Sequence, residues 1–327
     1  MPDKPREFQR IDDFFAPLAR RAEGAFGLQD DAAVMTPPEG RDLVVTTDTL
    51  VAMVHFLEED GPADLAAKLL RVSLSDLAAM GAEPFAYTLN LALPPEIDDP
   101  WLDAFTAGLA QDQDRYGIDL IGGDTVSTPG MLTVGATLFG TVPSGLALRR
   151  AGAAPGDLIM VSGTIGDGAL GLLAAQNRLA GIPAEVAQEL AQRYRRPEPR
   201  VVLGQGLIGL ASAAIDVSDG LAGDLAHMAA ASGVRIVLEA PSVPLSAAAA
   251  EVLHADPSRL LHVLTGGDDY ELAFAVPPAR RSQVETIARS GGVDVTAVGR
   301  VEQGSGLVVQ DSQGRPMDLP TLGYSHG

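Results

Sequence analysis

The sequence predicts an α/β or α+β protein that is built from two domains. Strand and helix signals alternate along the first half of the chain, and the alternation starts again in the second half. The segment Gly145–Asp157, which contains Gly and Pro residues and the pair Arg149-Arg150, separates the two alternations and indicates a connection. A chain of 327 residues also exceeds one ordinary core. We therefore expect one domain at 1–145 and a second at 150–327.

The first domain begins with a β-branched run at Leu43–Thr47, which predicts a strand. Apolar residues at helical spacing follow in Ala63–Met80 and predict a helix. The remaining signals predict, in order, a strand at Phe85–Leu93, a helix at Pro100–Tyr116, a strand that ends at Ile121 and a strand at Met131–Val142.

The second domain repeats this alternation and ends in what we expect to be a hairpin. Its first part predicts a strand at Leu158–Ser162, helices at Ala169–Leu179 and Ala184–Arg195, a turn at Pro197–Pro199, a helix at Val201–Ala211, a strand at Ala214–Val217, a helix at Leu221–Ala231 and a strand at Arg235–Leu238. Its last part predicts a strand at Tyr270–Val276, a helix at Gln283–Ser290, and a closing hairpin from Val295–Val301 and Leu307–Gln310.

Charge and composition exclude several classes of partner. The formal charge is -20, from 43 acidic and 23 basic residues, which argues against nucleic acid or an anionic membrane because both require a basic face. The same charge is compatible with cation binding. The chain has no Cys and five His, which removes disulfides and thiol nucleophiles and argues against a structural zinc site.

The polar start of the chain and the short length of its apolar runs predict a cytoplasmic protein. Met1–Arg10 is polar and charged, unlike a signal peptide. No later run approaches the roughly 18 apolar residues of a membrane span.

Short acidic clusters beside Gly, Ser or Thr recur along the chain, and we expect each where a helix or strand begins or ends. A single Asp at such a place is often a cap or turn residue for structural reasons alone, but repeated Asp with flanking hydroxyls exceeds what capping requires. Mg²⁺ binds carboxylate and water oxygens and is commonly shared with substrate phosphates. Converging carboxylates would repel one another, and a bound cation makes the arrangement favourable. The clusters are Gln29-Asp30-Asp31-Ala32, Thr46-Thr47-Asp48, Ser75-Asp76, Gly122-Gly123-Asp124-Thr125, Asp216-Val217-Ser218-Asp219-Gly220 and Gly266-Gly267-Asp268-Asp269-Tyr270.

The sequence contains no clear example of the usual phosphate-binding motifs. The chain has no Gly-x-x-x-x-Gly-Lys-Ser/Thr, which argues against a P-loop enzyme. Gly204, Gly206 and Gly209 match Gly-x-Gly-x-x-Gly but lie within a helical run, so we interpret them as a helix-packing feature. The stretch Val161–Gly168 follows a strand and opens a helix. It is either an anion-binding turn or an ordinary Gly-rich βα turn.

His55 and Arg150 each have two interpretations. His55 follows a strand signal, and a lone His has many structural uses besides catalysis. Arg150 is either a surface charge of the connection or a phosphate ligand, for which the forked guanidinium is well shaped.

Together these motifs resemble the thiamine-monophosphate kinase family, in order from about Asp12 to Tyr324. That family resembles aminoimidazole ribonucleotide synthetase in fold. The resemblance implies an N-terminal α/β domain whose strands join a partner's in a homodimer, and a C-terminal α/β domain that closes the active site. It implies phosphorylation of thiamine monophosphate by ATP to thiamine diphosphate, the last step of that cofactor's biosynthesis, with several Mg²⁺ ions.

The resemblance also implies roles for individual residues. The Mg²⁺ ligands would be Asp31, Thr46, Thr47, Asp48, Asp76, Asp124, Asp216 and Asp219, of which Asp48, Asp76, Asp124 and Asp219 would form the catalytic group. ATP would be bound by Gly123, Asp124, Arg150 and Ser218, and thiamine monophosphate by His55, Asp268 and Thr321.

Three positions depart from the family pattern. Gln29 stands where the family usually has Gly before the Asp pair, and Asp268 stands where Glu is also found. Thr321 stands where the family can place an aromatic residue against the substrate.

A phosphate monoester with a second pKa of about 6 is mostly dianionic at neutral pH, so no general base is required. We therefore expect direct in-line transfer, without a phosphoenzyme, in which electrostatics and alignment set the barrier.

Two other classes of function compete with this interpretation. One is another ATP-using enzyme of the same superfamily with a different acceptor, such as aminoimidazole ribonucleotide synthetase itself. Selenophosphate synthetases and hydrogenase maturation factors commonly use Cys or selenocysteine, and this chain has no Cys. The other class is a non-catalytic acidic protein that binds Ca²⁺ or a protein partner. The sequence contains no EF-hand pattern, which argues against the Ca²⁺-binding form.

Overall fold

The computed structural model describes residues 9–324, and the chain divides into two compact units. The first unit comprises the residues up to Leu77 together with Glu83–Gly145, and the second comprises Ala78–Ala82 together with the residues from Leu146 onward. Within 9–324, no helix has both the length and the apolar character required to cross a membrane. The cytoplasmic location stays a prediction.

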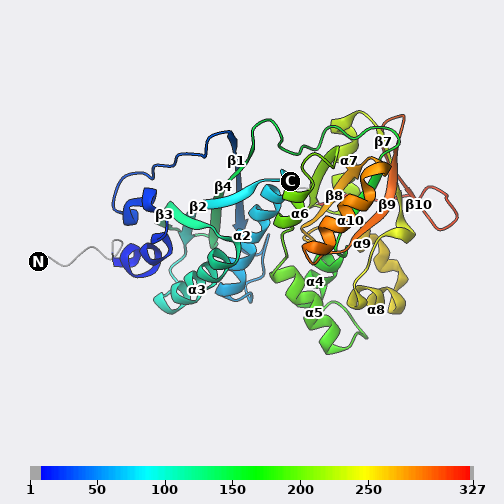
Figure 1. The fold of residues 1–327 in the computed structure, drawn as a ribbon. Coiled ribbons are helices and arrows are strands. Elements are labelled where there is room, and N and C mark those ends of the chain that lie inside the picture. Colours follow the sequence, from blue (N-terminus) through cyan, green and yellow to red (C-terminus); the bar gives the residue numbers. More distant parts are fainter. Residues whose placement is uncertain (1–8, 325–327) are drawn as a thin grey trace, which may run out of the picture. The chain divides into compact units, whose positions relative to one another are not determined.

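The first unit is built on one mixed four-stranded sheet in the order β1-β4-β2-β3 (Figure 1). β4 pairs antiparallel with both β1 and β2, and β2 pairs parallel with β3. Three short helical segments, Ile11–Phe15, Ala16–Ala19 and Glu23–Leu28, precede the sheet. The longer elements are β1 (Arg41–Val51), α2 (Pro62–Ala79), β2 (Glu83–Leu93), α3 (Asp99–Tyr116), β3 (Asp119–Ser127) and β4 (Thr133–Pro143).

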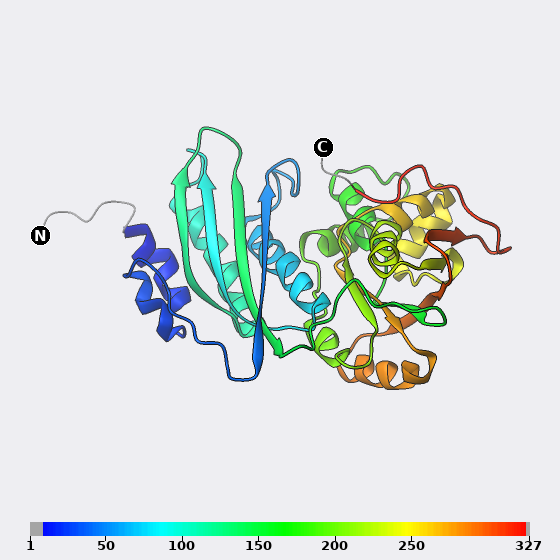
Figure 2. The ribbon, with the colours of Figure 1, turned by 90° about the horizontal axis from the view of Figure 1, so that it is seen from above.

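Helices α2 and α3 cover one face of this sheet, as Figure 2 shows from above. Leu69 of α2 and Phe105 of α3 are buried, as is Leu89 among the alternate apolar positions of β2. α3 begins at a regular cap, because the Asp98 carboxylate accepts a hydrogen bond from the Trp101 amide at 2.9 Å. It ends at Gly117, whose φ of 66° suits a left-handed C-cap.

The opposite face of the sheet is only partly covered. Ala19 and Ala25 of the N-terminal helical segments pack there against Ala86 and Ile121. Along β1 the outward side chains remain exposed, including Leu43 at 44% and Val45 at 53%. In the described residues β1 is also an edge strand, so apolar surface and an unpaired strand edge occur together.

The prediction that the third strand ends at Ile121 is wrong. β3 continues through the Gly-Gly-Asp-Thr motif to Ser127, after a bulge opposite Tyr87/Thr88. Gly123 makes this continuation feasible, because a Cβ at that position would lie 2.0 Å from the Leu89 carbonyl oxygen. The motif that resembles a turn in the sequence is therefore a strand in which two backbones approach closely.

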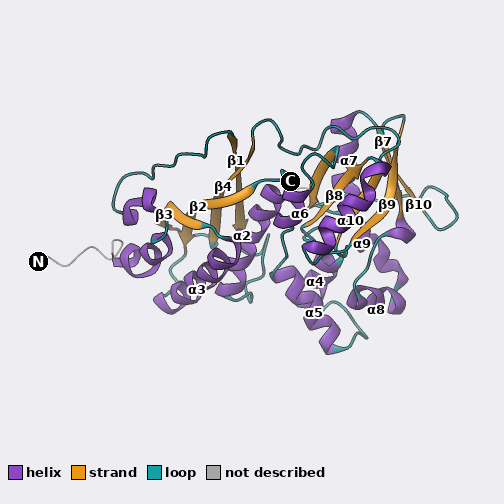
Figure 3. Cartoon of the chain, viewed as in Figure 1, coloured by secondary structure: helices purple, strands orange, loops and turns teal. Residues whose placement is uncertain are grey.

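The second unit contains a six-stranded sheet in the order β10-β7-β9-β5-β8-β6, with helices around it (Figure 3). Only β7 and β10 pair in parallel; the other neighbours are antiparallel. The elements are β5 (Leu158–Ser162), α4 (Asp167–Ala175), α5 (Ala184–Arg195), α6 (Val201–Gly206), β6 (Ala213–Val217), α7 (Leu221–Ser232), β7 (Arg235–Glu239), α8 (Ala247–Ala255), α9 (Leu260–Thr265), β8 (Glu271–Val276), α10 (Arg281–Ser290), β9 (Val295–Glu302) and β10 (Gly306–Gln310).

Strand β8 and its neighbour β6, which lies at the edge of the sheet, are buried on both faces. All the residues of β6 and β8 are buried, as expected for a sheet that has helices on each side. One face packs on α7 through residues such as Ile215 and Leu225. Because side chains alternate along a strand, Asp216 points to the other face.

The predicted closing hairpin is wrong. β9 and β10 do not pair with each other, because β7 lies between them. The link Gln303–Ser305 passes over the start of β7, where Arg235 is in register with both Glu302 and Gly306. Sequence periodicity identifies the two strands, but it contains no signal for a third strand inserted from about 60 residues earlier.

The interpretation of the Gly204/Gly206 motif as a packing feature is confirmed. A Cβ on Gly204 would lie 2.0 Å from the Ala78 carbonyl oxygen, and one on Gly206 would lie 2.4 Å from the Ile287 side chain. These glycines allow α6 to pack closely against α10 and against Ala78, a residue at the end of α2 that belongs to the second unit.

Candidate active site

Two hydrogen bonds between β1 and α2 bring four polar residues together. Thr46 Oγ1 donates to the Asp76 carboxylate at 2.5 Å, and Ser73 Oγ donates to Asp48 Oδ2 at 2.6 Å. Thr46 and Asp48 share one face of a strand because they are two residues apart, and Ser73 and Asp76 share one face of a helix because they are three apart. The two periodicities therefore place two carboxylates and two hydroxyls side by side.

This arrangement corrects the expectation that every acidic cluster marks the end of an element. Thr46-Thr47-Asp48 lies within β1, and Ser75-Asp76 lies within α2. Ser73 was not among the predicted site residues. Its position three residues before Asp76, on the same helical face, is the signal that could have identified it.

Burial raises the pKa of Asp48 above its usual value, although the hydrogen bond from Ser73 opposes the shift. The ionised form of this carboxylate is therefore costly where it lies, and a cation beside it would offset that cost. Hard oxygen donors of this kind are the ligands that Mg²⁺ prefers. The Asp48–Asp76 pair thus fits a magnesium site by its chemistry.

The other predicted ligands of the first unit lie apart from this pair. Thr47 points to the exposed face of the sheet, where its hydroxyl accepts a hydrogen bond from Thr137 at 3.1 Å. Asp124 is exposed on β3, in register with the exposed Asn90. Asp31 is exposed in a bend that follows Glu23–Leu28.

His55 lies in a turn at the end of β1 that is fixed on two sides. The Val51 amide donates to His55 Nδ1 at 3.0 Å, so in the neutral ring the proton is on Nε2. The ammonium of Lys68, a buried residue of α2, donates to the His55 carbonyl oxygen at 3.0 Å. These two bonds fix the backbone of the turn and the tautomer of the ring.

In the second unit, one buried carboxylate organises the loop that carries Ser218 and Asp219. Asp224 Oδ2 accepts hydrogen bonds from the amides of Ser218, Asp219 and Gly220 at 3.1, 3.1 and 3.2 Å. Burial and the nearby charge of Asp219 nonetheless raise the pKa of Asp224 to about 7. Asp224 was not predicted, although an Asp in the first turn of a helix is a recognised signal for binding the preceding amides.

The remaining predicted residues of the second unit occupy varied positions. Asp216 is buried on β6, immediately before the Asp224-bound loop. Asp268 is half-buried in the loop Gly266–Tyr270, which we call the Asp268 loop. Arg150 and Thr321 are exposed. Close to Thr321, the Tyr324 amide donates to the Asp219 carbonyl oxygen at 2.9 Å, which fixes the end of the described chain to the same loop.

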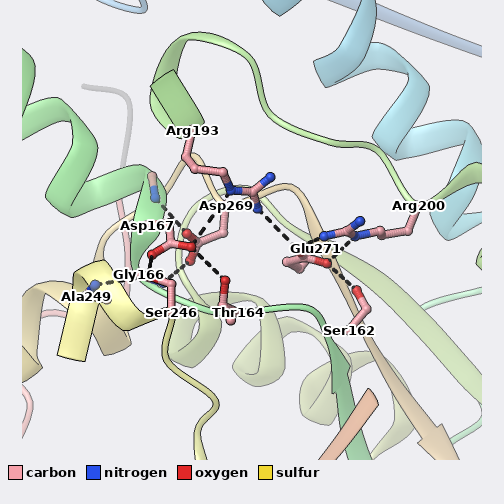
Figure 4. Close-up of polar contacts among 11 residues, drawn as sticks. Ser162, Thr164, Gly166, Asp167, Arg193, Arg200, Ser246, Ala249, Asp269 and Glu271 are labelled. Atoms are coloured by element: carbon pink, nitrogen blue, oxygen red, sulfur yellow. Dashed lines mark hydrogen bonds and ion pairs between the residues drawn. The ribbon is translucent and has the colours of Figure 1, made fainter. Parts of the chain in front are cut away.

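A buried ionic network lies beside the Asp268 loop (Figure 4). Glu271 is fully buried and accepts hydrogen bonds from Ser162 at 2.5 Å, from Arg193 at 3.2 Å and from two nitrogens of Arg200. Asp167 accepts hydrogen bonds from Thr164 and Ser246, each at 2.6 Å. No buried side-chain nitrogen or oxygen in the described part of the chain lacks a hydrogen-bond partner, so the acids of this network are compensated.

The network decides between the two interpretations of the Gly-rich turn, Gly163–Gly168. Its amides at Gly166 and Gly168 donate to the Asp269 carboxylate at 2.7 and 2.9 Å. Asp269 is 2% exposed, and burial raises its pKa well above the usual value despite these donors. The anion at this helix N-terminus is therefore a side chain of the protein itself, and the turn is structural.

The predicted metal ligands are divided between the two units. Asp31, Thr46, Thr47, Asp48, Asp76 and Asp124 belong to the first unit, and Asp216 and Asp219 belong to the second. Over residues 9–324, no three His, Asp or Glu side chains gather closely enough to hold a metal ion by themselves. The structure brings together Thr46, Asp48 and Asp76, with Ser73.

Comparison with known proteins agrees with this architecture. The family model "AIR synthase related protein, N-terminal domain" matches residues 29–142, and "AIR synthase related protein, C-terminal domain" matches residues 154–312. The chain therefore has the two-domain α/β fold of AIR synthase-related proteins.

Individual relatives identify the family more closely. The chain is 44% identical to the thiamine-monophosphate kinase of Salmonella typhimurium, over 98% of each chain. It is similar to the crystal structure of thiamine-monophosphate kinase from Stenotrophomonas maltophilia K279a, with a TM-score of 0.85 and 42% identity over 95% of this chain and 98% of that one. It is also similar to a structure described as AaThiL complexed with AMPPCP and TMP, with a TM-score of 0.79 and 28% identity over 94% and 98% of the two chains. By sequence and by fold, this chain belongs to the thiamine-monophosphate kinase family.

Proposed function

We propose that this protein transfers the γ-phosphoryl group of ATP to thiamine monophosphate in an in-line reaction, with the carboxylates of Asp48 and Asp76 holding Mg²⁺. The overall reaction gives ADP and thiamine diphosphate and is that of the family. The observation that carries the proposal is the side-by-side placement of these two carboxylates, with their hydroxyl partners, between β1 and α2. A relative of similar fold binds AMPPCP and TMP together, which supports direct transfer between two bound substrates.

Strand β1 and helix α2 hold the carboxylates of Asp48 and Asp76 in fixed positions for the reaction. When bound, Mg²⁺ would neutralise charge on the phosphates and reduce the repulsion between the two anionic reactants. The chain's own contribution is to orient the carboxylates, because Ser73 and Thr46 each fix one of them by a hydrogen bond. Both bonds join regular elements, which hold a side chain more precisely than loops do.

The acceptor would be oriented by His55 and Asp268. The Nε2–H of His55 is a suitable donor to a phosphate oxygen, and its partner nitrogen is occupied by the Val51 amide. The carboxylate of Asp268 complements the positive charge of a thiazolium ring. Since the acceptor phosphate is already mostly dianionic at neutral pH, neither residue has to remove a proton.

The other predicted contacts also remain proposals. We assign Gly123, Asp124, Arg150 and Ser218 to ATP, Thr321 to thiamine monophosphate, and Asp31, Thr46, Thr47, Asp124, Asp216 and Asp219 to further Mg²⁺ ions. Supporting them are their positions in motifs that resemble the family, and, for Ser218 and Asp219, a loop fixed by three hydrogen bonds to Asp224.

The test of the function is simultaneous measurement of ADP and thiamine diphosphate. With ATP, thiamine monophosphate and Mg²⁺, the protein is expected to form both products in equal amounts, and EDTA in excess of Mg²⁺ is expected to stop the formation of both. Formation of ADP without thiamine diphosphate would mean that the protein does not transfer the phosphoryl group to thiamine monophosphate and acts on a different acceptor. Radiolabel from γ-labelled ATP that stays on the denatured protein in the absence of acceptor would contradict direct transfer.

We further propose that the protein is a homodimer joined through β1. The exposed side chains of Leu43 and Val45 lie on the open face of the sheet, on its edge strand β1. Replacing Val45 by Lys should disrupt such an interface, because a charge would be buried without a partner. Light scattering is expected to give twice the chain mass for the wild type and the single-chain mass for Val45→Lys.

A matched control for this prediction is Val202→Lys on α6. Val202 is 66% exposed and lies in the second unit, so the same substitution there should leave the mass unchanged. A single-chain mass for the wild type, or an unchanged dimer for Val45→Lys, would contradict the proposal.

A further inference from the structure

The Asp268 loop is held in a conformation that its residues do not prefer. Asp268 has a φ of 71° and Tyr270 a φ of 52°, so two non-glycine residues on either side of Asp269 are in the left-handed region. Asp tolerates this region moderately well, whereas a bulky Tyr does so rarely. Such residues persist only where their surroundings determine the backbone, and they are common where a ligand is bound.

The buried carboxylate of Asp269 is what fixes this backbone on one side. Its two oxygens accept one hydrogen bond each from the amides of Gly166 and Gly168 at the start of α4 (Figure 4). The fit is close, since a Cβ on Gly168 would lie 2.3 Å from the Asp268 carbonyl oxygen. Asp269 therefore joins the Asp268 loop to the N-terminus of a helix.

Backbone hydrogen bonds fix the loop on its other side. The Asp268 amide donates to the Ser218 carbonyl oxygen at 2.9 Å, and the Tyr270 amide donates to the Val217 carbonyl oxygen at 2.8 Å. With the backbone held in this way, the Tyr270 hydroxyl reaches its neighbour's carboxylate and donates to Asp268 Oδ1 at 3.1 Å. The left-handed conformation at both residues is what gives the loop this geometry.

We propose that Asp269 and Tyr270 are positioning residues for the acceptor: Asp269 fixes the backbone of the loop, and the Tyr270 hydroxyl orients the Asp268 carboxylate toward thiamine monophosphate. The inference rests on the proposed role of Asp268. It adds two residues that act through Asp268 and make no contact with the reacting atoms. It also gives a function to the strain in this loop.

The first test is a double-mutant cycle on Tyr270 and Asp268, measured as KM and kcat for each substrate. Tyr270→Phe removes only the hydroxyl, and it is expected to raise KM for thiamine monophosphate about fivefold with kcat and KM for ATP unchanged. Asp268→Ala should raise KM for thiamine monophosphate about 30-fold because a charged partner is lost. Adding Tyr270→Phe to Asp268→Ala should have no further effect, because Tyr270 acts through the missing carboxylate.

Asp269→Asn tests the backbone part of the inference. The amide keeps the shape of the side chain but replaces one acceptor oxygen by a donor that faces a backbone N–H. KM for thiamine monophosphate is expected to rise at least as much as in Tyr270→Phe, while KM for ATP stays unchanged. If Asp269→Asn does not fold, the Tyr270–Asp268 cycle still decides the inference. Thr286→Val is the control, since the Thr286 hydroxyl donates only within α10, and it should change neither KM.

These measurements distinguish the positioning role of Asp269 and Tyr270 from the role of Asp268 as an acceptor contact. Additive effects of Tyr270→Phe and Asp268→Ala would overturn the positioning role while leaving Asp268 as an acceptor contact. An unchanged KM for thiamine monophosphate in Asp268→Ala would overturn the role of Asp268 and the inference with it. Equal changes of KM for both substrates in folded Asp269→Asn would indicate a general structural role and would also overturn the inference.

Discussion

Replacing Asp48 by Asn is expected to abolish thiamine diphosphate formation while preserving the fold. The substitution removes a carboxylate proposed to hold Mg²⁺, and losing several kcal/mol of transition-state stabilisation lowers kcat by on the order of 10³-fold. The neutral amide should not destabilise the protein, because burial already raises the pKa of Asp48 and makes its charge costly. The measurements are kcat at saturating ATP and Mg²⁺, and the Tm in EDTA.

Asp42→Asn is the matched control for this prediction. Asp42 lies on the same strand but is exposed, and it accepts hydrogen bonds from Ser144 Oγ and the Gly145 amide, each at 2.8 Å. Its replacement should leave kcat unchanged. Mg²⁺ should raise the Tm of the wild type more than that of Asp48→Asn, because a ligand stabilises only the protein that binds it. A kcat for Asp48→Asn within a few-fold of the wild type would remove Asp48 from the catalytic group.

Replacing Asp112 by Ala is expected to cause the largest loss of stability in the first unit. Arg71 of α2 and Asp112 of α3 form a two-point ion pair, with both nitrogen–oxygen distances at 2.8 Å and side-chain exposures of 8% and 4%. Removing Asp112 takes the two-point ionic partner away from the buried guanidinium of Arg71, and breaking a buried pair in this way costs about 3–5 kcal/mol. The measurement is the free energy of unfolding of the first unit, from urea titrations followed at probes placed in it.

Asp99→Ala provides the comparison. The Arg10–Asp99 pair has a similar distance of 2.9 Å, but Asp99 is 53% exposed, so its loss should cost about 0–1 kcal/mol. Equal losses from the two substitutions would mean that burial does not determine the strength of these pairs. Replacing Arg71 and Asp112 together by apolar residues should cost less than Asp112→Ala alone, because the charge of Arg71 is then removed together with its ionic partner.

Local signals in the sequence predict most elements of the fold. They fail where pairing with a distant segment determines the end of a strand or the order of the strands. The bounds of Leu158–Ser162 and Ala184–Arg195 agree with the structure at both ends, because turn residues limit them in the sequence. The strand expected to end at Ile121 continues to Ser127, since pairing with β2 overrides the turn tendency of Gly-Gly-Asp. Helices α8 and α9 were not predicted at all, and the order of β9, β7 and β10 depends on pairing that no local pattern contains.

The candidate site is predictable to a similar extent. Acidic motifs identify Asp48 and Asp76, but they do not reveal the hydroxyl of Ser73 or the carboxylate of Asp224 that support the site residues. Glu271 and Arg200 are separated by 71 residues, so periodicity has no means of pairing them. The Gly-rich turn could not be interpreted from its own sequence, because the anion that it binds, Asp269, lies about a hundred residues later.

The spacing of side chains along helix α2 determines three contacts in the first unit, and this limits where the chain can vary in length. Lys68 supports the His55 turn, Ser73 donates to Asp48, and Asp76 accepts from Thr46. All three contacts depend on the spacing along one helix. One residue inserted between Lys68 and Asp76 would turn the following side chains by about 100° and shift them by about 1.5 Å. Such an insertion would separate the His55 turn from the carboxylates, whereas the exposed turn at Asp311–Arg315 could gain residues without moving either. Related sequences should therefore differ in length at such loops and keep a constant number of residues from Lys68 to Asp76.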